Sequence, residues 1–509
     1  MFQLNKNLLL PINKGRQRVL LLSAFFLFAG SYLATTLNAQ NRNALWCFGD
    51  SAGLNFTDTS NVTTFSTGLD TRGTCVSICD LNGNLLFYAG TRAGFGVTST
   101  VVYNRNNELM ENGDSIIGEG WYNELQIIPF PEDSMKYYLF SVSVAGNNGV
   151  FYSIVDLNEN GGEGKIIQKN ILLGSYYAYD AMASYKNGNG RDWWVITKVF
   201  SNLSATNLWH VYSVTPNGIT DSIQGSGFSE SGNLGNLVFY NNGSKLLFSS
   251  FQGLVEKMEF DRCSGIISNP QTITSSSARY IGSAISSNGQ VLYLSTNNPT
   301  SYLYQFDLTA TNIFNSRIVI DTISYPASAG GVLRLAPNNK IYWGIPFTDG
   351  HYPYHDNEYN VYNMNLSVIN NPDVLDTGCN FTRFSTYLGG KRAYYGLPNN
   401  PLYETPSLSG SICDTLTSGV IEPRSTNSTV EIYYHSGWNK LFLNAKHLSG
   451  NKLRCVLFNS IGQVVRNFEF ELNGNFLSEE IDIGFLSTGI YFISLSDLNQ
   501  TVSKKFFKY

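Results

Sequence analysis

The chain has 509 residues, of which 14% are charged and 14% aromatic, and its formal net charge is -5. Its 47 glycines and only 6 methionines suit many short strands joined by tight turns, and suit neither a helical bundle nor a disordered chain. A net negative charge offers no basic surface to a phosphate backbone, so we expect no nucleic acid as a partner.

The first 39 residues have the pattern of a secretory signal. Basic residues flank an apolar stretch from Val19 to Ala34, and Leu37-Asn38-Ala39 forms a small-residue cleavage site of the A-x-A kind. A membrane anchor is the alternative, but sixteen apolar residues are fewer than the ~20 that span a bilayer. We therefore expect an exported mature chain without a transmembrane segment.

Seven cysteines follow this segment, in a compartment where we expect oxidation. On one strand Cys75 and Cys79 would lie ~13 Å apart at ~3.3 Å per residue, whereas a disulfide needs Cα atoms within ~7 Å. Those two should not bridge each other. We expect small buried thiols with one or two disulfides and, because the number is odd, at least one free cysteine.

One pattern recurs along the chain, a polar turn followed by large apolar residues. The first copy, from Asp80 to Gly90, reads DLNGNLLFYAG. Aligned on the polar residue that leaves the turn, the copies fall at Asn84, Lys136, Asp192, Lys245, Gln290, Lys340 and Arg392, with spacings of 52, 56, 53, 45, 50 and 52. Strand-like runs precede each copy and follow most of them, so the unit is a small antiparallel sheet.

Repeats of ~40 to 50 residues, each a sheet unable to bury its own faces, are typical of a β-propeller. Seven copies predict an all-β fold with a seven-bladed propeller over residues 40–404. Little chain follows the seventh copy, and residues 44–57 precede the first without a hairpin of their own. We expect residues 44–57 to complete the last blade and close the ring, which removes two exposed sheet edges. Two stacked β-sandwiches are the rival architecture, which the steady repeat disfavours.

The chain changes character after Glu404. Residues 405–427 are rich in Ser, Thr, Pro and Gly and are typical of a linker. Residues 428–509 consist of short alternating strands broken by glycine or asparagine, which predicts a small C-terminal β-sandwich. The polar linker indicates that this domain moves independently of the propeller.

Three motifs stand in order in this tail: VLFNSIGQVV (Val456 to Val465), LSTGIYFISL (Leu486 to Leu495) and KKFFKY (Lys504 to Tyr509). Their combination resembles the type A C-terminal sorting domain of the type IX secretion system of Bacteroidota. The resemblance implies export to the periplasm, recognition of the tail by the type IX secretion machinery, and a final place in the medium or on the outer-membrane cell surface. An extra sandwich that serves only stability is the alternative.

The repeat region carries further recognisable stretches. They are LWCFGDSAGLNF, CDLNGNLLFYAG, FDRCSGIISNP (Phe260 to Pro270), INNP within Ser367 to Phe381, and YGLPN (Tyr395 to Asn399). Together they resemble an exported propeller-like domain found in Bacteroidota proteins of unassigned activity. This resemblance brings no catalytic residues with it.

Histidine is scarce, with five in the chain, and two fall in the loop from Thr348 to Asn360. The ligand-type residues of this loop are Asp349, His351, His355, Asp356 and Glu358. These residue types suit Ca²⁺ or Zn²⁺, which makes the loop a candidate metal site. A solvated polar loop is the alternative, because Pro353 opposes the helix on which both histidines would share a face.

The cluster SYYAYD, which lies outside the predicted strands, supplies candidates for ligand contact. Its tyrosines, Tyr176, Tyr177 and Tyr179, could form a platform on which a sugar stacks. His210 falls inside a strand-like run, where a structural histidine is the better interpretation. The carboxylates near predicted strand ends are Asp180, Asp192, Glu230 and Asp349. Their spacing reveals no catalytic arrangement, so we predict that the protein is not an enzyme.

We therefore expect a secreted or cell-surface binding or adhesion module, with a glycan or a surface protein as its ligand and no required cofactor. The alternative is an extracellular polysaccharide hydrolase or lyase with its site in the central funnel, where loops of several blades converge. The two hypotheses differ in what the funnel holds. An enzyme needs converging carboxylates or a histidine-carboxylate cluster, whereas a binding site needs only an aromatic or polar rim.

Overall fold

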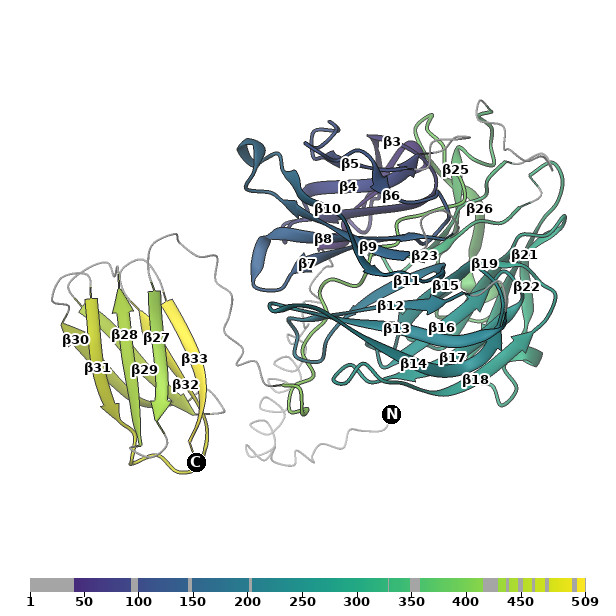
Figure 1. Ribbon diagram of the computed structural model, residues 1–509. Helices are drawn as coiled ribbons and strands as arrows, with labels where there is room; N and C mark the ends of the chain where they lie inside the picture. The colour runs from purple at the N-terminus through teal and green to yellow at the C-terminus, as the bar shows by residue number, and fades with distance from the viewer. Residues whose placement is uncertain are drawn as a thin grey trace, which may run out of the picture.

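A computed structural model describes residues 41–92, 99–144, 149–200, 204–327, 329–347, 358–414, 429–435, 439–446, 452–459, 463–471, 476–496 and 501–508. In these residues every regular element is a strand (Figure 1), apart from the short 3-10 helices η1 (Asn41–Asn43), η2 (Asn160–Gly162), η3 (Phe314–Ser316) and η4 (Asp376–Cys379). The prediction of an all-β chain is confirmed. No helix in this part of the chain is long and apolar enough to cross a membrane. The predicted signal, residues 1–39, lies outside the described residues.

The strands up to β26 form consecutive sheets along the chain. The first sheet comprises β1 (Leu45–Phe48), β2 (Asp50–Asn55), β3 (Thr63–Cys79), β4 (Leu85–Arg92), β5 (Ser99–Asn104) and β6 (Ile116–Ile117). The second comprises β7 (Leu125–Phe130), β8 (Asp133–Ser143), β9 (Gly149–Asp156) and β10 (Lys165–Gly174). The third comprises β11 (Ala178–Lys186), β12 (Trp193–Val199), β13 (Thr206–Thr215) and β14 (Gly218–Glu230).

The next three sheets repeat the four-stranded order. The fourth comprises β15 (Gly235–Tyr240), β16 (Lys245–Ser250), β17 (Leu254–Phe260) and β18 (Ile267–Ser275). The fifth comprises β19 (Tyr280–Ile285), β20 (Val291–Thr296), β21 (Ser301–Asp307) and β22 (Ile318–Ile323). The sixth comprises β23 (Leu333–Leu335), β24 (Ile341–Trp343), β25 (Asn365–Ile369) and β26 (Phe381–Tyr387).

Every strand in these sheets pairs antiparallel with the next one along the chain, so each sheet is a simple meander. The repeated polar turn joins two paired strands in six places, and the aligned residues there are Asn84, Lys136, Asp192, Lys245, Gln290 and Lys340. In the first turn Gly83 has a φ of 85°, and the Asp80 amide donates to the Asn84 carbonyl at 2.8 Å. The hairpins predicted for these six copies are confirmed.

The seventh copy behaves differently, and the hairpin predicted there is wrong. β26 pairs with β25 as the outer strand of the sixth sheet, and two glycines of positive φ, Gly389 and Gly390, then redirect the chain. The Asp50 amide of β2 donates to the Arg392 carbonyl at 2.9 Å. The residues of the seventh copy therefore pair with β2 and not with the strand that precedes them. β1 and β2 themselves form an antiparallel hairpin, so the expectation that residues 44–57 have no hairpin of their own is wrong.

β3 of the first sheet and the first strands of the other sheets lie against one another in chain order, from β3 through β7, β11, β15 and β19 to β23. We call these six strands the first strands. Hydrogen bonds from Val332 to the Tyr395 carbonyl (2.8 Å) and from Tyr395 to the Arg72 carbonyl (3.0 Å) link the last sheet to the first. The sheets thus follow one another around an axis, with their first strands innermost, as in a β-propeller.

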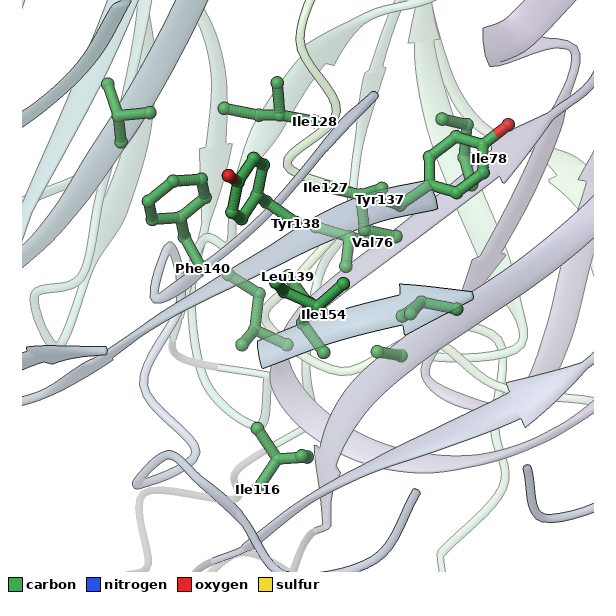
Figure 2. Packing of buried hydrophobic residues seen from close by; sticks show 14 of the residues in the cluster. Val76, Ile78, Ile116, Ile127, Ile128, Tyr137, Tyr138, Leu139, Phe140 and Ile154 are labelled. Atoms are coloured by element: carbon green, nitrogen blue, oxygen red, sulfur yellow. The ribbon is translucent and has the colours of Figure 1, made fainter. Parts of the chain in front are cut away.

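Apolar side chains fill the space between neighbouring sheets. Figure 2 shows one such cluster, in which Val76 and Ile78 of β3 lie near Ile127 of β7 and Leu139 of β8. All four are fully buried. Both faces of a blade are covered by its neighbours, so the sequences of its central strands are nearly continuous apolar runs. Burial of each large apolar side chain contributes roughly 1.5 to 3 kcal/mol to the free energy of folding.

The C-terminal part contains two further sheets. One comprises β27 (Thr429–His435), β28 (Lys440–Lys446) and β31 (Phe476–Asp482). The other comprises β30 (Val464–Glu471), β29 (Lys452–Asn459), β32 (Gly489–Ser496) and β33 (Thr501–Lys508). A single hydrophobic cluster includes Leu441 and Ile481 from the first sheet and Cys455 and Ile493 from the second. The two sheets therefore share one core.

Candidate functional site

The main candidate site is a cavity of about 280 Å³ at the centre of the ring. The first strands β7, β11, β15, β19 and β23 contribute to its wall, together with residues 399–402. On β11 and β19 the lining residues fall in the second half of the strand, on β15 they are its middle residues and the one that follows, and after β23 the wall continues into the hairpin turn at Pro337 and Asn339. We call this side the turn end of the ring, and the opposite side, where the first strands begin, the loop end.

Arg334 of β23 is the charged residue among those that line the cavity. Its Nε donates to the Pro398 carbonyl (3.1 Å) and its Nη1 to the Leu333 carbonyl (3.2 Å). Its Nη2 donates to the side-chain oxygens of Asn123 and Asn399, the latter at 3.1 Å. Burial lowers the pKa of Arg334 to about 10, so the guanidinium remains charged at neutral pH.

Asn399 holds the chain across the ring beside this arginine. Its Nδ2 donates to the carbonyls of Met182 (3.0 Å) and Leu125 (3.2 Å), on two different first strands. Its own carbonyl accepts a short hydrogen bond from Gln126, whose Oε1 accepts one from Ser184. These bonds fix the side chains that line the cavity in one arrangement.

The loop end contains a fully buried carboxylate, Glu124, directly before β7. Its two oxygens accept hydrogen bonds from the amides of Glu119, Gly120 (3.2 Å) and Trp121 (3.0 Å). Burial raises the pKa of Glu124 to about 8, although these amides act in the opposite direction. Its evident role is to hold the loop that precedes β7.

Asp180 of β11 is the second buried carboxylate of the loop end. It accepts hydrogen bonds from the amides of Tyr122 (2.9 Å), which precedes β7, and Gly235 (2.8 Å), which begins β15. Burial raises the pKa of Asp180 to about 7, while its amide partners and the charge of Arg334 act in the opposite direction. Asp180 therefore ties three consecutive sheets together.

A separate buried polar cluster lies between the third and fourth sheets. Lys198 of β12 has no exposed surface, and its Nζ has no hydrogen-bond partner but lies 4.4 Å from the centre of the Trp209 ring. Burial lowers the pKa of Lys198 to about 8, although the negative charges of Glu230 and Glu256 act to raise it. Glu230 accepts a hydrogen bond from Ser250 at 2.9 Å through one of its oxygens.

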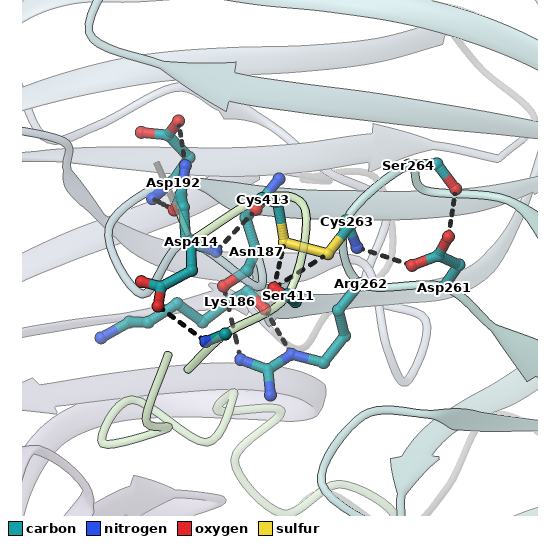
Figure 3. The surroundings of a disulfide bond; sticks show 12 residues. Lys186, Asn187, Asp192, Asp261, Arg262, Cys263, Ser264, Ser411, Cys413 and Asp414 are labelled. Atoms are coloured by element: carbon teal, nitrogen blue, oxygen red, sulfur yellow. Dashed lines mark hydrogen bonds between the residues drawn. A yellow bond between two sulfur atoms is a disulfide. The ribbon is translucent and has the colours of Figure 1, made fainter. Parts of the chain in front are cut away.

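Residues 399–414, which we call the strap, run along the turn end of the ring. A disulfide joins Cys413 of the strap to Cys263, which follows β17 (Figure 3). The Arg262 guanidinium donates to the Pro406 carbonyl at 2.9 Å, and the Leu408 amide donates to the Gly188 carbonyl at 2.7 Å. Residues 405–414, which we assigned to a linker, are thus bound to the ring.

The other cysteines of the described chain are free and buried, and Cys75 and Cys79 do not bridge.

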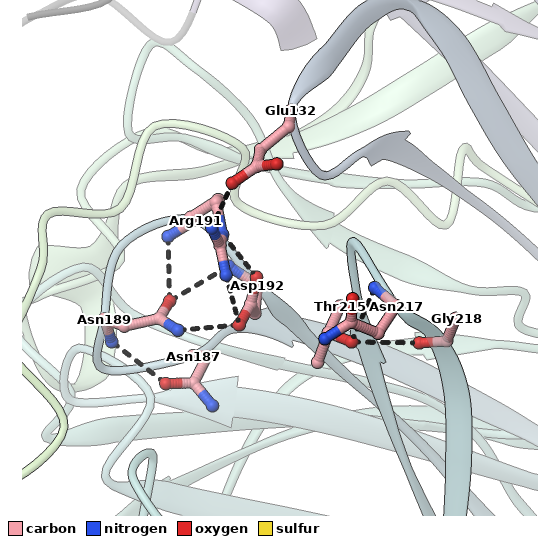
Figure 4. A network of polar contacts seen from close by, with 8 residues as sticks. All are labelled: Glu132, Asn187, Asn189, Arg191, Asp192, Thr215, Asn217 and Gly218. Carbon is pink, nitrogen blue, oxygen red and sulfur yellow. Dashed lines mark hydrogen bonds and ion pairs between the residues drawn. The ribbon is translucent and has the colours of Figure 1, made fainter. Parts of the chain in front are cut away.

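Asp192, one of the carboxylates singled out by sequence, belongs to the turn between β11 and β12. It accepts hydrogen bonds from Asn189 Nδ2 (2.8 Å) and Arg191 Nε (2.7 Å), and Arg191 also pairs with Glu132 of the second sheet (Figure 4). Both of these partners belong to its own turn. Asp192 therefore stabilises a turn and the contact between two neighbouring turns.

The side chains of the three candidate tyrosines lie in different surroundings. Tyr179 is fully buried among the residues between the third and fourth sheets. Tyr176 stacks on His210 with ring centroids 3.8 Å apart, and its hydroxyl bonds to Thr197 at 2.6 Å. Only Tyr177 is substantially exposed, at 39%. A single stacking platform of three rings is not formed, because β11 begins at Ala178 and carries Tyr179 into the interior.

Of the candidate metal ligands, Asp349, His351, His355 and Asp356 lie outside the described residues. Glu358 is exposed, and its backbone carbonyl accepts hydrogen bonds from Asn363 (2.7 Å) and Arg392 (3.0 Å). No group of three or more His, Cys, Asp or Glu suited to a metal ion occurs in the part of the chain that the structure describes. The metal site stays a prediction.

Sequence reasoning missed Glu124, Arg334 and Asn399. Two signals were present: an arginine inside the apolar run GVLRLA, from Gly331 to Ala336, and the terminal asparagine of YGLPN. An ionisable residue within a buried strand usually has a specific partner. That partner could not be identified, because Asn399 and Asn123 are distant from Arg334 in the sequence.

Residues 427–509 match the family model of the secretion system C-terminal sorting domain. The tail is therefore a type IX sorting domain. It directs the protein to the cell surface or the medium, and it implies contact with the secretion machinery. No curated protein matches the chain.

Solved structures similar to this chain include a putative 6-phosphogluconolactonase from Bacteroides fragilis, with 10% identity and a TM-score of 0.44 over 69% of this chain and 96% of that one. The periplasmic gluconolactonase PpgL from Pseudomonas aeruginosa has 13% identity and a TM-score of 0.34 over 78% and 99% of the two chains. The β-propeller domain of Cps50 (Swd1) from Myceliophteria thermophila has 11% identity and a TM-score of 0.35 over 60% and 93%. Likeness at this level indicates neither an activity nor a substrate for this chain.

Proposed function

We propose that this chain is an exported binding module whose ligand occupies the cavity at the turn end of the ring. The observation that carries this proposal is the composition of the wall, which contains asparagine, glutamine, serine, tyrosine and apolar residues around a single arginine. No Asp, Glu, His, Cys or Lys is among the residues that line it. Such a wall can hold a molecule and can hardly transform it.

The alternative function, an extracellular polysaccharide hydrolase or lyase, has less support. Glycoside hydrolysis in most families needs two carboxylates on either side of the bond that breaks. Two buried carboxyl groups of the ring, Glu124 and Asp180, are at the loop end and accept hydrogen bonds from backbone amides. Glu230 and Glu256 are also buried, and they accept hydrogen bonds from Ser250 and from the Phe228 amide, respectively. His210 and Asp221 are paired at 2.6 Å, but His210 is buried under Tyr176.

We infer further that the ring has seven blades. The long strand β3 supports this inference, because its first part pairs with β2 and its second part pairs with β4. The six-stranded first sheet would then hold one complete blade and the outer strands of another. Residues after Arg392, which contact both β3 and the start of the sixth sheet, would supply the innermost strand of that blade.

We also infer that the tail is a β-sandwich and that residues 1–39 are a signal cleaved during export through the inner membrane of a bacterium of the Bacteroidota. The shared core of the two C-terminal sheets supports the sandwich. The basic flank and A-x-A site of the N-terminal segment support the signal.

The binding proposal is tested with glycan and protein arrays, probed with the disulfide-bonded mature chain. Leu402→Trp places a larger side chain at the mouth of the cavity, where Leu402 is 36% exposed. We expect this variant to lose at least tenfold in affinity for any ligand that the array identifies. Leu81→Trp is the matched control, because Leu81 is exposed on a hairpin turn and does not line the cavity. Equal binding by both variants would place the site elsewhere.

A further inference from the structure

The cavity has one charged residue and otherwise neutral surroundings. Its apolar wall includes Leu237, Ile285, Leu333 and Pro337. In such surroundings a charge interacts with a ligand more strongly than it would in water, because the dielectric is lower. The sign of this one charge therefore selects among ligands of similar size.

The positive charge of Arg334 has no carboxylate among its hydrogen-bond partners. The acceptors are two backbone carbonyls and the amide oxygens of Asn123 and Asn399. A guanidinium has five N–H groups, and these partners use all but one, which belongs to Nη1. Asp180 is a carboxyl group whose charge acts on Arg334, and it is itself engaged by the amides of Tyr122 and Gly235.

A second polar group in the wall lacks a partner. Ser283 of β19 is 1% exposed and lines the cavity, and its Oγ has no hydrogen-bond partner among the described residues. A buried hydroxyl left without a partner costs about 1 to 3 kcal/mol, which a bound acceptor would recover. β19 and β23 are adjacent first strands, so Ser283 and Arg334 approach the cavity from neighbouring walls.

We propose that the cavity binds a small organic anion, a carboxylate with a compact apolar or ring-shaped body, whose anionic group accepts hydrogen bonds from Arg334 and Ser283. The proposal rests on the binding function assigned to this cavity above. Its size, about 280 Å³, is near the lower end of the range for small-molecule pockets, which fits a molecule of one ring. A neutral sugar of the same size is the alternative occupant.

The test compares matched acids and neutral analogues with the mature, disulfide-bonded chain. The pairs are glucuronate with glucose and phenylacetate with phenylacetamide, titrated by calorimetry in low salt. We expect the acid of at least one pair to bind at least tenfold more tightly than its neutral partner. We also expect Leu402→Trp to weaken that binding by a similar factor.

Ser283→Ala tests the serine without removing the buried arginine. We expect it to weaken binding of the acid three- to tenfold and to leave the melting temperature within a few degrees of the wild type. Ser249→Ala is the matched control, because Ser249 is also buried and without a partner but does not line the cavity. It should bind the acid as the wild type does.

The outcomes separate this inference from the binding function. Binding of neutral analogues as tightly as acids, when Leu402→Trp abolishes both, would overturn the anion preference and leave the cavity as the site. Binding of acids that neither Leu402→Trp nor Ser283→Ala weakens would overturn both proposals. Absence of binding by either acid at 10 mM would overturn the anion proposal, while the array result still decides the binding function.

Discussion

At the loop end of the ring the buried ionisable groups include the carboxyl groups of Glu124 and Asp180 and the pair Lys198 and Glu230, whereas at the turn end the charge in the wall of the cavity belongs to Arg334. Glu124 and Asp180 accept hydrogen bonds from backbone amides. Arg334 lies beside a cavity, next to the regular hairpin turns. Glu124 thus holds a segment outside the sheets, and Asp180 joins the same segment to the first residue of β15, whereas the regular turns need no such support.

This difference bears on where a ligand site can form. The irregular loops vary in length and sequence and are the usual place for a site. In this ring their buried charges are already used to order the loops. The turn end keeps space at its centre because its turns are short and satisfy their own hydrogen bonds, as the turn from Asn187 to Asp192 does.

The largest effect is expected at the loop end, for Glu124→Ala. The change leaves the amides of Glu119, Gly120 and Trp121 without an acceptor in a buried site, so we expect a loss of about 3 to 5 kcal/mol in the free energy of unfolding. Urea unfolding measures it. Glu124→Gln keeps an acceptor and the shape, and should lose about half as much. A loss below about 0.5 kcal/mol for Glu124→Ala would contradict the role assigned to this carboxylate.

A smaller effect is expected at the turn end when the strap is released. Replacing Cys263 and Cys413 by serine together should lower the free energy of unfolding by about 2 to 4 kcal/mol, because the disulfide closes a long loop. Hydrogen exchange should increase in residues 399–414 and remain unchanged around Glu124. The wild type under reducing conditions should behave like the double variant. If the strap is equally protected from hydrogen exchange in the wild type and in the double variant, its hydrogen bonds hold it to the ring without the disulfide.

The smallest effect concerns Lys198, which also lies toward the loop end, because the next residue, Val199, pairs with Ala178 at the start of β11. Its pKa falls from 10.5 in the unfolded chain to about 8, so the stability linked to this group is complete above pH 10.5 and is lost as the pH falls through 8. Lys198→Met combined with Glu230→Gln removes the lysine and one of the two buried carboxyl groups that attract it. We expect it to be more stable than the wild type by on the order of 1 to 2 kcal/mol at pH 7, with an advantage that fades between pH 8 and 10.5. A pH-independent difference would show that the lysine does not titrate in this range.

The sequence predicts much of the fold, because the hairpin is a local unit. At Asn84 and Lys245, for example, a polar turn and an apolar run contain all that the pairing of two adjacent strands requires. The seventh copy has the same local pattern, yet Arg392 pairs with Asp50, which comes from the N-terminal start of the repeat region. A pairing over that separation leaves no trace in the spacing of repeats.

The candidate site is predicted far less well. The pattern places Arg334 on a strand but cannot reveal that Asn123 and Asn399 surround it, since each comes from a different segment. The tyrosines mislead for a related reason, because a one-residue difference in where β11 begins decides whether Tyr179 faces ligand or core. Sites of a ring are assembled across blades, and a repeat pattern describes each blade alone.

The disulfide between Cys263 and Cys413 also determines how the ring responds to mechanical load. The sorting domain follows the strap in the chain, so a pull transmitted from that domain during export reaches Cys413 before any other residue of the ring. The covalent bond passes this force directly to the turn at Cys263. Residues 399–412 are then shielded from tension, and the mouth of the cavity keeps its shape while the chain is drawn from its C-terminal side.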